Sequence, residues 1–375
     1  MKITQVELFH IAIPFATPYK LSKAYGTLDI AHAIIFKVHT DEGLVGFGEA
    51  DPMNPFCEDT PGSVIAVAQE MLIPRLLGQD PMQIRTLESA FDQCVLGHLN
   101  ARAAVNMALY DLVGKASHVP VHVLLGGLRH RTLEIWEALG SGTPEEDRAI
   151  IERKMAQGYK TFMLKMGVLP ISAEIKRVAA VRKQFGDTIT LLVDVNQGWD
   201  FAQTREFING VRDFPPDLME QPVPRWDIDS LKKIHDMAPC MLSCDESLST
   251  VHDAATLIRE RAVDAFSIKV SKNGGLDKSR QIATLADAFG LQCIMNSMFE
   301  FGITQAALLQ LGCTLCNLAD MGHSYFSVLR MSDDVTDFAR NISGATITVP
   351  SAHGLGVAVD EDKLRKYTLD HVTLK

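Results

Sequence analysis

The chain has 375 residues, which is enough for two hydrophobic cores or for one barrel with an added domain. Its residues are 47% hydrophobic and 22% charged, a composition that excludes a disordered protein. The net charge of −10 argues against a nucleic-acid or acidic-membrane partner, because both require a basic face. A small anionic substrate stays compatible with this charge, because a local cation can attract it.

The first residues alternate like a strand, and the sequence has neither an apolar signal segment nor a run long enough to cross a membrane. Its seven cysteines are scattered, and the close pairs Cys240/Cys244 and Cys313/Cys316 have no partners at zinc-site spacing. We therefore expect reduced thiols and a cytoplasmic location.

Residues 1–125 are predicted to form an α+β domain. Alternating apolar residues predict three strands, and longer amphipathic runs predict three helices. The strands are expected at 3–13, 31–39 and 43–49, and the helices at 63–77, 84–96 and 100–116. Two stretches rich in proline and polar residues, 14–27 and 51–61, are expected to be loops that could carry function.

From residue 126 to 345 short apolar strands alternate with amphipathic helices. Eight such units are predicted, with strands at 133–139, 161–166, 188–196, 218–221, 241–246, 265–272, 292–299 and 318–321. Eight β/α units predict a TIM-type barrel rather than a doubly wound sheet. Residues 346–375 contain no further unit, and we expect them to return to the first domain.

Three consecutive predicted strands end in an acid: Asp194, Glu220 and Asp245. Active sites of such barrels lie at the carboxyl ends of the strands, and strand alternation turns Asp194 and Asn196 into the lumen. Three carboxylates that converge there would suit Mg²⁺, which prefers oxygen ligands. Each acid alone would be explained as well by a helix cap or a surface charge.

Two lysines are also predicted to face the lumen, Lys165 on the second strand and Lys269 on the sixth. They lie on opposite sides of the three acids. Burial and a nearby dication both lower the pKa of a lysine, so that it can act as a base near neutral pH. The alternative is a lysine that only pairs with a carboxylate, and Lys272, of opposite parity, is expected to orient its neighbours.

This set of residues resembles the enolase superfamily, specifically its muconate-lactonizing subgroup, over nearly the whole chain. The resemblance implies a modified barrel with an N-terminal capping domain, and Mg²⁺ (or Mn²⁺) bound by Asp194, Glu220 and Asp245. It also implies that the metal holds the carboxylate of a small-molecule substrate while Lys165 and Lys269 move the α-proton through an enolate-type intermediate. A homo-oligomer is expected as well.

The sequence departs from the family pattern in ways that bear on the reaction. Met163 stands where the subgroup commonly has the first lysine of Lys-x-Lys, which removes a charge that would lower the pKa of Lys165. Lys269 and Met298 occupy places where the mandelate-racemase-like branch has Asp and His, so that branch is disfavoured. Only Asp320 is present of the Asp-x-Asp found in dipeptide epimerases, which disfavours a dipeptide substrate.

Candidate substrate contacts come from the same resemblance. The first loop, 18–22, is similar to that of muconate cycloisomerases, and we expect Tyr19, Lys20 and Tyr25 to close over the barrel mouth. Polar residues at later strand ends could select the substrate, although a helix cap or a solvated charge would explain them equally. These candidates are Asn196, Glu300, Asp320 and His323.

Three functions remain open at this point. The first is racemisation or epimerisation of a small, amino-acid-like carboxylate, which needs a lysine on each face. The second is cycloisomerisation or elimination by the same site, with one lysine as a bystander. The third is a non-catalytic relative, which the retention of all five polar residues argues against.

Overall fold

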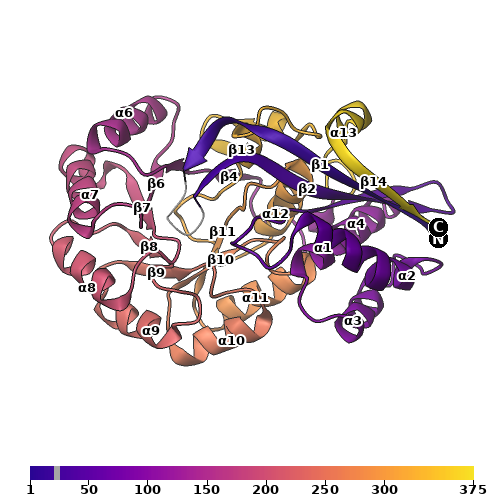
Figure 1. Ribbon diagram of the computed structural model, residues 1–375, viewed down its shortest axis with the longest axis horizontal. Helices are drawn as coiled ribbons and strands as arrows, with labels where there is room; N and C mark the ends of the chain where they lie inside the picture. Colours follow the sequence, from indigo (N-terminus) through magenta and orange to yellow (C-terminus); the bar gives the residue numbers. More distant parts are fainter. Residues whose placement is uncertain (21–25) are drawn as a thin grey trace.

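The computed structural model describes the backbone of residues 1–20 and 26–375. It consists of an antiparallel sheet with its own helices and a curled parallel sheet ringed by helices (Figure 1). The capping domain and barrel predicted from the sequence are therefore confirmed. No helix in the described part of the chain is long and apolar enough to cross a membrane.

The capping sheet has the strand order β14-β1-β2-β3. Its strands are β1 (Ile3–Lys20), β2 (Thr27–Thr40), β3 (Val45–Ala50) and β14 (Thr368–Leu374). The prediction of a loop over 14–27 was wrong for residues 14–20, which belong to β1, and residues 21–25 lie outside the described residues. The pairing of β1 with β2 is irregular between Pro14 and Tyr19, where two prolines cannot donate to the ladder. Those prolines are what suggested a loop.

Helices α1 and α4 of the capping domain pack on this sheet, and the other helices of the domain pack against these two, against one another or against the barrel. The helices are α1 (Pro61–Val67), a π-helical turn (Ala68–Leu72), α2 (Ile73–Leu76), α3 (Ile84–Cys94), α4 (Leu99–Ala116) and α5 (Val121–Leu124). Helix α4 is buried almost throughout and lies directly on β3. A Cβ atom on Gly48 would lie 1.8 Å from the carbonyl oxygen of Ala104, so only glycine permits this approach.

The barrel sheet contains seven parallel strands, and each is followed by a helix on the outside (Figure 1). The strands are β5 (Glu137–Leu139), β6 (Thr161–Lys165), β7 (Thr190–Asp194), β8 (Leu218–Glu220), β9 (Met241–Cys244), β10 (Ala265–Ile268) and β11 (Gln292–Met295). The helices are α6 (Pro144–Met155), α7 (Ile171–Phe185), α8 (Phe201–Gly210), α9 (Ile228–Met237), α10 (Val251–Glu260), α11 (Leu276–Ala288) and α12 (Gly302–Gly312).

The eighth predicted unit differs from the expectation. The segment 318–323 forms only isolated bridges, from Leu318 to Cys293 on one side and from His323 to Ile135 on the other. It closes the barrel between β11 and β5 without becoming a regular strand. Two short 3-10 turns, Ser327–Leu329 and Phe338–Asn341, stand where a helix was expected.

The first predicted strand, 133–139, is divided in two. Its first part, β4 (Thr132–Glu134), pairs with β13 (Thr346–Thr348), which also pairs with β12 (Ile342–Ser343). The expected return of the chain to the capping domain at residue 346 was therefore too early. The tail first bonds to the capping domain at Gly354, which pairs with Val119 and Val121, and α13 (Glu361–Tyr367) and β14 then contact β1.

Side chains alternate between the lumen and the helices along each barrel strand. On β6, Met163 packs inside against Leu192 and Leu218, while Phe162 and Leu164 pack outside. Each fully buried side chain of this kind contributes roughly 1.5–3 kcal/mol to folding. The apolar layer fills the lower lumen and leaves polar side chains only at the carboxyl ends of the strands.

The capping domain is attached to the barrel next to this mouth. The carboxylate of Glu49, at the end of β3, accepts hydrogen bonds from the backbone nitrogens of Phe301 (2.6 Å), Ile303 (3.1 Å) and Thr304 (3.2 Å). These are free donors at the start of α12, and a carboxylate is favoured there by the helix dipole. The contact fixes β3 against the end of β11.

Candidate active site

Three acids end adjacent strands at the mouth of the barrel. Asp194 and Glu220 are the last residues of β7 and β8 and lie opposite each other in the register, and Asp245 directly follows β9. All three side chains are buried. The only potential metal ligands that they supply are carboxylate oxygens, the type that Mg²⁺ prefers.

Glu220 is the central member of this triad. Asn296 Nδ2 donates to its Oε1 (3.1 Å) and Ser243 Oγ donates to its Oε2 (3.3 Å). Burial, followed by repulsion from Asp194 and Asp245, raises the pKa of Glu220 well above its usual range. The three carboxyl groups therefore lie close enough to repel one another when they are ionised, and a bound cation would relieve this repulsion.

Lys165 and Lys269 lie on the two sides of the triad. Lys165 Nζ donates to Asp194 Oδ2, and Lys269 Nζ donates to Asp245 Oδ2 at 2.6 Å. Burial, the largest single effect, would lower the pKa of both lysines, but the nearby acidic groups together raise it, with Asp194 foremost for Lys165 and Asp245 for Lys269. Both lysines are thus held as ammonium groups in this structure.

Lys272 donates hydrogen bonds to the same acid as Lys269, which is Asp245. Its Nζ donates to Asp245 Oδ1 at 2.7 Å and to the Asp245 carbonyl oxygen at 2.6 Å. Burial would raise the pKa of Asp245, yet the two lysines together lower it. Lys272 is therefore placed to fix the orientation of Asp245, the kind of role that the sequence suggested for it.

The residues present fit a divalent cation by their chemistry. Within the described ranges no three His, Cys, Asp or Glu side chains already form an arrangement ready to hold a metal ion. Asp194 and Asp245 are instead turned onto lysines. Ammonium groups and a metal ion compete for the same oxygens, so cation binding at Asp194, Glu220 and Asp245 requires these ion pairs to loosen.

Asn196 links the triad to Glu246, the acid directly after Asp245. Its backbone nitrogen donates to Asp194 Oδ1 (3.0 Å), and its side-chain oxygen lies 3.4 Å from Lys165 Nζ. Its Nδ2 donates to Glu246 Oε1 at 3.4 Å. The left-handed backbone of Asn196 (φ 47°) lets both contacts form directly after the strand.

Aromatic side chains of the capping domain cover both lysines. Lys269 Nζ lies 4.1 Å from the centroid of the Phe56 ring. Tyr19 is buried near Lys165, which is the largest charge acting on its hydroxyl, and burial raises the pKa of Tyr19. The ring of Tyr19 packs edge-on against Phe299, at 5.0 Å between centroids. Lys269 is 5% exposed and Lys165 is 14% exposed, so most of both side chains is covered.

Two residues in this site were missed by the sequence analysis. Asn296 could have been found, because it follows β11 with the same parity as Ile294, which faces the lumen. Phe56 gave no signal, because its contact with Lys269 depends on how the capping domain docks.

The predicted substrate contacts have different outcomes. Tyr19 lies at the mouth with its hydroxyl buried and without a hydrogen-bond partner among the described residues. Lys20 is the last residue of β1, and its side chain is not among those that the structure describes. Tyr25 lies outside the described residues. Glu300 is buried and accepts hydrogen bonds from Ser271, Ser297 and Gln305.

His323 and Asp320 are placed differently. His323 is buried in the barrel wall, where its Nδ1 accepts a hydrogen bond from the backbone nitrogen of Met295 at 3.3 Å. Burial, with a smaller effect of His130, lowers the pKa of His323 to about 3. This bond to the backbone holds the eighth segment against β11, and the contact of His323 with substrate stays a prediction. Asp320 is exposed.

Family models match both parts of the chain. The model described as "Enolase C-terminal domain-like" matches residues 146–363, and the model described as "Mandelate racemase / muconate lactonizing enzyme, N-terminal domain" matches residues 3–126.

Characterised relatives are similar over almost their full length. L-Ala-D/L-Glu epimerase of Bacillus subtilis is 32% identical over 364 residues, covering 95% of this chain and 97% of its own. Chloromuconate cycloisomerase of Cupriavidus pinatubonensis is 30% identical over 358 residues, covering 93% and 95%.

Solved structures of similar proteins also superpose on nearly the whole chain. N-succinyl Arg/Lys racemase from Bacillus cereus superposes with a TM-score of 0.95 at 28% identity, covering 100% of both chains. A dipeptide epimerase from Enterococcus faecalis, complexed with Mg and the dipeptide L-Leu-L-Tyr, superposes with a TM-score of 0.89 at 27% identity, covering 96% of this chain and 100% of its own.

Proposed function

The chain belongs to the mandelate racemase / muconate lactonizing enzyme family of the enolase superfamily, in the muconate lactonizing subgroup, and on that premise we propose that it racemises or epimerises a small, amino-acid-like carboxylate. It is an isomerase of this subgroup, which contains epimerases, racemases and cycloisomerases, and its reaction begins with abstraction of the proton α to a carboxylate. Relatives of each kind have similar identity to it, so the choice among them depends on the site.

The observation that carries the proposal is the placement of the lysines. Lys165, on β6, and Lys269, after β10, approach the triad from its two sides. A substrate carbon held over Glu220 would have one amine on each face. Removing a proton on one face and returning it on the other is what inversion of a stereocentre requires.

The carboxylate triad supports a cation in this reaction. Asp194, Glu220 and Asp245 would hold Mg²⁺ or Mn²⁺, which when bound supplies a positive charge for the substrate carboxylate and stabilises the charge that develops on it. Lys272 keeps Asp245 oriented for this role. Tyr19 and Phe56 exclude water, which strengthens every electrostatic interaction in the site.

The lysines must differ in protonation for the relay to work. The one that accepts the α-proton must be neutral, and the one that returns a proton must be an ammonium group. Since each lysine is bound to its own acid, either can be the proton donor. The same site can then process both enantiomers, with the two roles exchanged.

Cycloisomerisation is the second candidate, favoured by the 30% identity with chloromuconate cycloisomerase. In that reaction one lysine moves the proton and the other is not needed. Exchange of the α-proton in D₂O separates the two functions. We expect both enantiomers of the substrate, found among libraries of N-substituted amino acids, to incorporate deuterium and to interconvert. Turnover of muconates without exchange in any chiral carboxylate would overturn the racemase assignment.

A further inference from the structure

The backbone of Lys165 is held by a buried arginine on the helix outside the barrel. Arg177, on α7, is 1% exposed, and its Nη1 donates to the carbonyl oxygen of Lys165 at 2.8 Å. Its Nη2 donates at 3.1 Å to the carbonyl oxygen of Gly140, which directly follows β5. One guanidinium group therefore joins the carboxyl ends of two neighbouring strands, β5 and β6, behind the lysine.

Two acids accept the remaining N–H groups of Arg177. Asp147, on α6, accepts from Nε (2.8 Å) and Nη2 (3.1 Å), and Glu174, on α7, accepts from Nη1 (3.1 Å). All five N–H groups of the guanidinium thus have an acceptor, in a planar arrangement that a lysine cannot reproduce. Glu174 also accepts from the backbone nitrogens of Gly167 (3.1 Å) and Leu169 (3.2 Å), so the same cluster fixes the turn after β6.

Lys269 is held in a different way, by the side chain of Asn273. Asn273 is 1% exposed, and its Oδ1 accepts from the backbone nitrogen of Lys269 at 3.0 Å. Its Nδ2 donates to the carbonyl oxygens of Leu248 (2.9 Å) and Ser249 (3.1 Å), in the segment after β9. This amide therefore joins the end of β10, where Lys269 lies, to the segment that follows the neighbouring strand.

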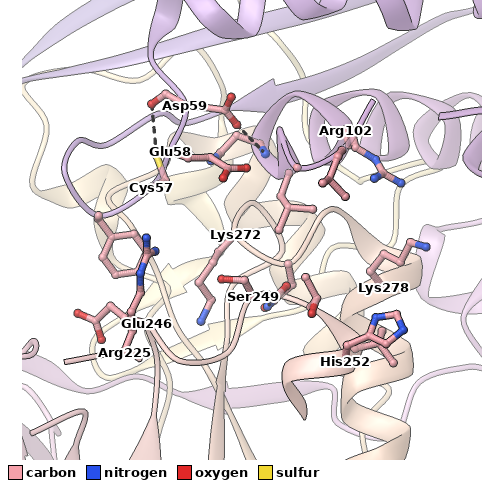
Figure 2. Close-up of a pocket in the computed structure, with 18 of the residues that line it drawn as sticks. Cys57, Glu58, Asp59, Arg102, Arg225, Glu246, Ser249, His252, Lys272 and Lys278 are labelled. Carbon is pink, nitrogen blue, oxygen red and sulfur yellow. Dashed lines mark hydrogen bonds between the residues drawn. The ribbon is translucent and has the colours of Figure 1, made fainter. Parts of the chain in front are cut away.

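The link through Asn273 lies beside a cavity between the capping domain and the barrel. The cavity has a volume of about 530 Å³, and Asn273, Lys272 and Ser249 are among the residues that line it. Figure 2 shows Lys272 and Ser249 on its barrel side. A substitution of Asn273 can therefore change substrate binding as well, whereas Arg177 is enclosed by protein.

We propose, resting on the proposed function, that Arg177 and Asn273 are positioning residues, each for one lysine: Arg177 sets the position of Lys165, and Asn273 sets that of Lys269. In the described part of the chain the two sets of hydrogen bonds have no residue in common. Proton transfer depends steeply on the position of the base, and a misplacement of about 1 Å can cost roughly 10²-fold in rate. Disturbing one link should therefore slow exchange on one face of the substrate carbon and spare the other.

Deuterium exchange of each enantiomer tests the link to Lys165. Arg177→Lys keeps a positive charge between Asp147 and Glu174 but cannot reach all the acceptors. For the enantiomer whose exchange Lys165→Ala blocks, we expect kcat for exchange to fall by roughly 10- to 100-fold, while the other enantiomer keeps its wild-type rate. Asp147→Asn disturbs the same cluster at almost constant volume. It should change the ratio of the two rates in the same direction, and it replaces Arg177→Lys if that variant does not fold.

Asn273→Ala should give the opposite result. It should slow exchange of the enantiomer that depends on Lys269 and spare the one that depends on Lys165. The rates are compared as kcat at saturating substrate, so that a change of KM caused by the adjoining cavity does not enter the ratio. Loss of stability alone would lower both rates together, so a change in their ratio is specific to positioning.

Arg182 provides the matched control. It lies further along α7, and it donates to the carbonyl oxygens of Pro215, Gly186 and Ile189 and to Asp217, at the amino ends of the strands. Arg182→Lys should lower the thermal midpoint without changing the ratio of the two rates. An unchanged ratio in Asp147→Asn and in Asn273→Ala, or equal losses on both enantiomers, would overturn the assignment.

NMR spectroscopy separates this inference from the proposed function, because it needs no turnover. In protein whose lysines carry ¹³C at Cε, Lys165→Arg and Lys269→Arg assign the two signals. Asp147→Asn should move the Lys165 signal alone, and Asn273→Ala the Lys269 signal alone. If the signals move in this way but the wild type exchanges the α-proton of no carboxylate, the racemase proposal fails and the positioning links stand. If exchange occurs and neither the signals nor the rate ratio change, the links are wrong and the racemase proposal stands.

Discussion

Lys165 and Lys269 bind the two outer acids of the triad, Asp194 and Asp245, and Glu220 between them has no lysine partner among the residues that the structure describes. Each lysine therefore has its own carboxylate and its own side of the site. This separation predicts that the lysines can be tested one at a time.

The two lysines should act on opposite faces of the substrate carbon. Lys165→Ala should block exchange from one enantiomer and spare exchange from the other, and Lys269→Ala should show the reverse. Each variant should lose racemisation by roughly 10²–10⁴-fold or more, the usual contribution of a proton-transfer group. Deuterium exchange of each enantiomer, followed by mass spectrometry, measures the exchange rate of each variant on each face. Lys160→Ala, an exposed lysine, is the control. Normal exchange on both faces in both variants would contradict the two-lysine mechanism.

Mg²⁺ should stabilise the folded protein through the triad. A ligand at 100 times its Kd adds about 2.7 kcal/mol to the free energy of unfolding, so the thermal midpoint should rise when Mg²⁺ is added to EDTA-treated protein. In Glu220→Gln this rise should disappear. The metal-free variant should be at least as stable as the wild type, because the substitution removes repulsion from Asp194 and Asp245. Glu134→Gln, at an exposed acid, should respond to Mg²⁺ normally. An unchanged response in Glu220→Gln would place the metal elsewhere.

Met163→Lys should shift the pH dependence of catalysis. Met163 and Lys165 are two residues apart on β6 and both point into the lumen, so a lysine at 163 would place a second positive charge near Lys165. A like charge disfavours the ammonium form, so the pKa of Lys165 should fall and the limb of the pH–rate profile that reports it should move to lower pH. The variant should also be less stable, because Met163 lies in an apolar layer with Leu192 and Leu218. Met163→Leu should leave the profile in place, and an unmoved limb in Met163→Lys would refute the coupling.

Glu88 should make the folded protein less stable as the pH rises. Burial raises the pKa of Glu88 to about 7 from its usual 4.5, against the lowering effects of Asn106 and Arg102. The protonated form is therefore favoured by folding. Its stabilising contribution is complete below pH 4.5 and is lost as the pH rises through about 7. A shift of this size corresponds to about 3 kcal/mol.

Glu88→Gln removes this titration. Urea unfolding at intervals from pH 4.5 to 8 should show the variant gaining stability relative to wild type across that window. Glu70→Gln, at an exposed position on the same domain, should give a constant difference. Parallel stability curves for Glu88→Gln and wild type would show that folding does not shift the pKa of Glu88.

The barrel site could be located from sequence because its residues follow a local rule. Asp194, Glu220 and Lys165 end strands, and the two-residue period of a strand decides which of their neighbours face the lumen. The burial of Met163 inside and of Leu164 outside follows the same period. Local alternation does not depend on tertiary contacts, so it could be read before the fold was known.

Features that depend on distant contacts could not be predicted. Phe56 covers Lys269 only because β3 and the segment after it dock on the barrel through Glu49. The division of 133–139 into β4 and β5 depends on pairing with β13, far along the chain. The role of His323 depends on complete burial, which a polar residue in an irregular segment does not indicate.

The pairing of β14 with β1 has a consequence for how the protein is made. Residues 368–374 form the edge strand beside Val6–Ile11, and the two ends of the described chain lie together (Figure 1). During synthesis the ribosome therefore releases the entire barrel before the capping sheet receives its last strand. Until then β1 keeps an open edge, which is a site for pairing with other chains. Joining the two ends with a short linker and opening the chain in an exposed loop of the barrel would let β14 and β1 emerge in succession.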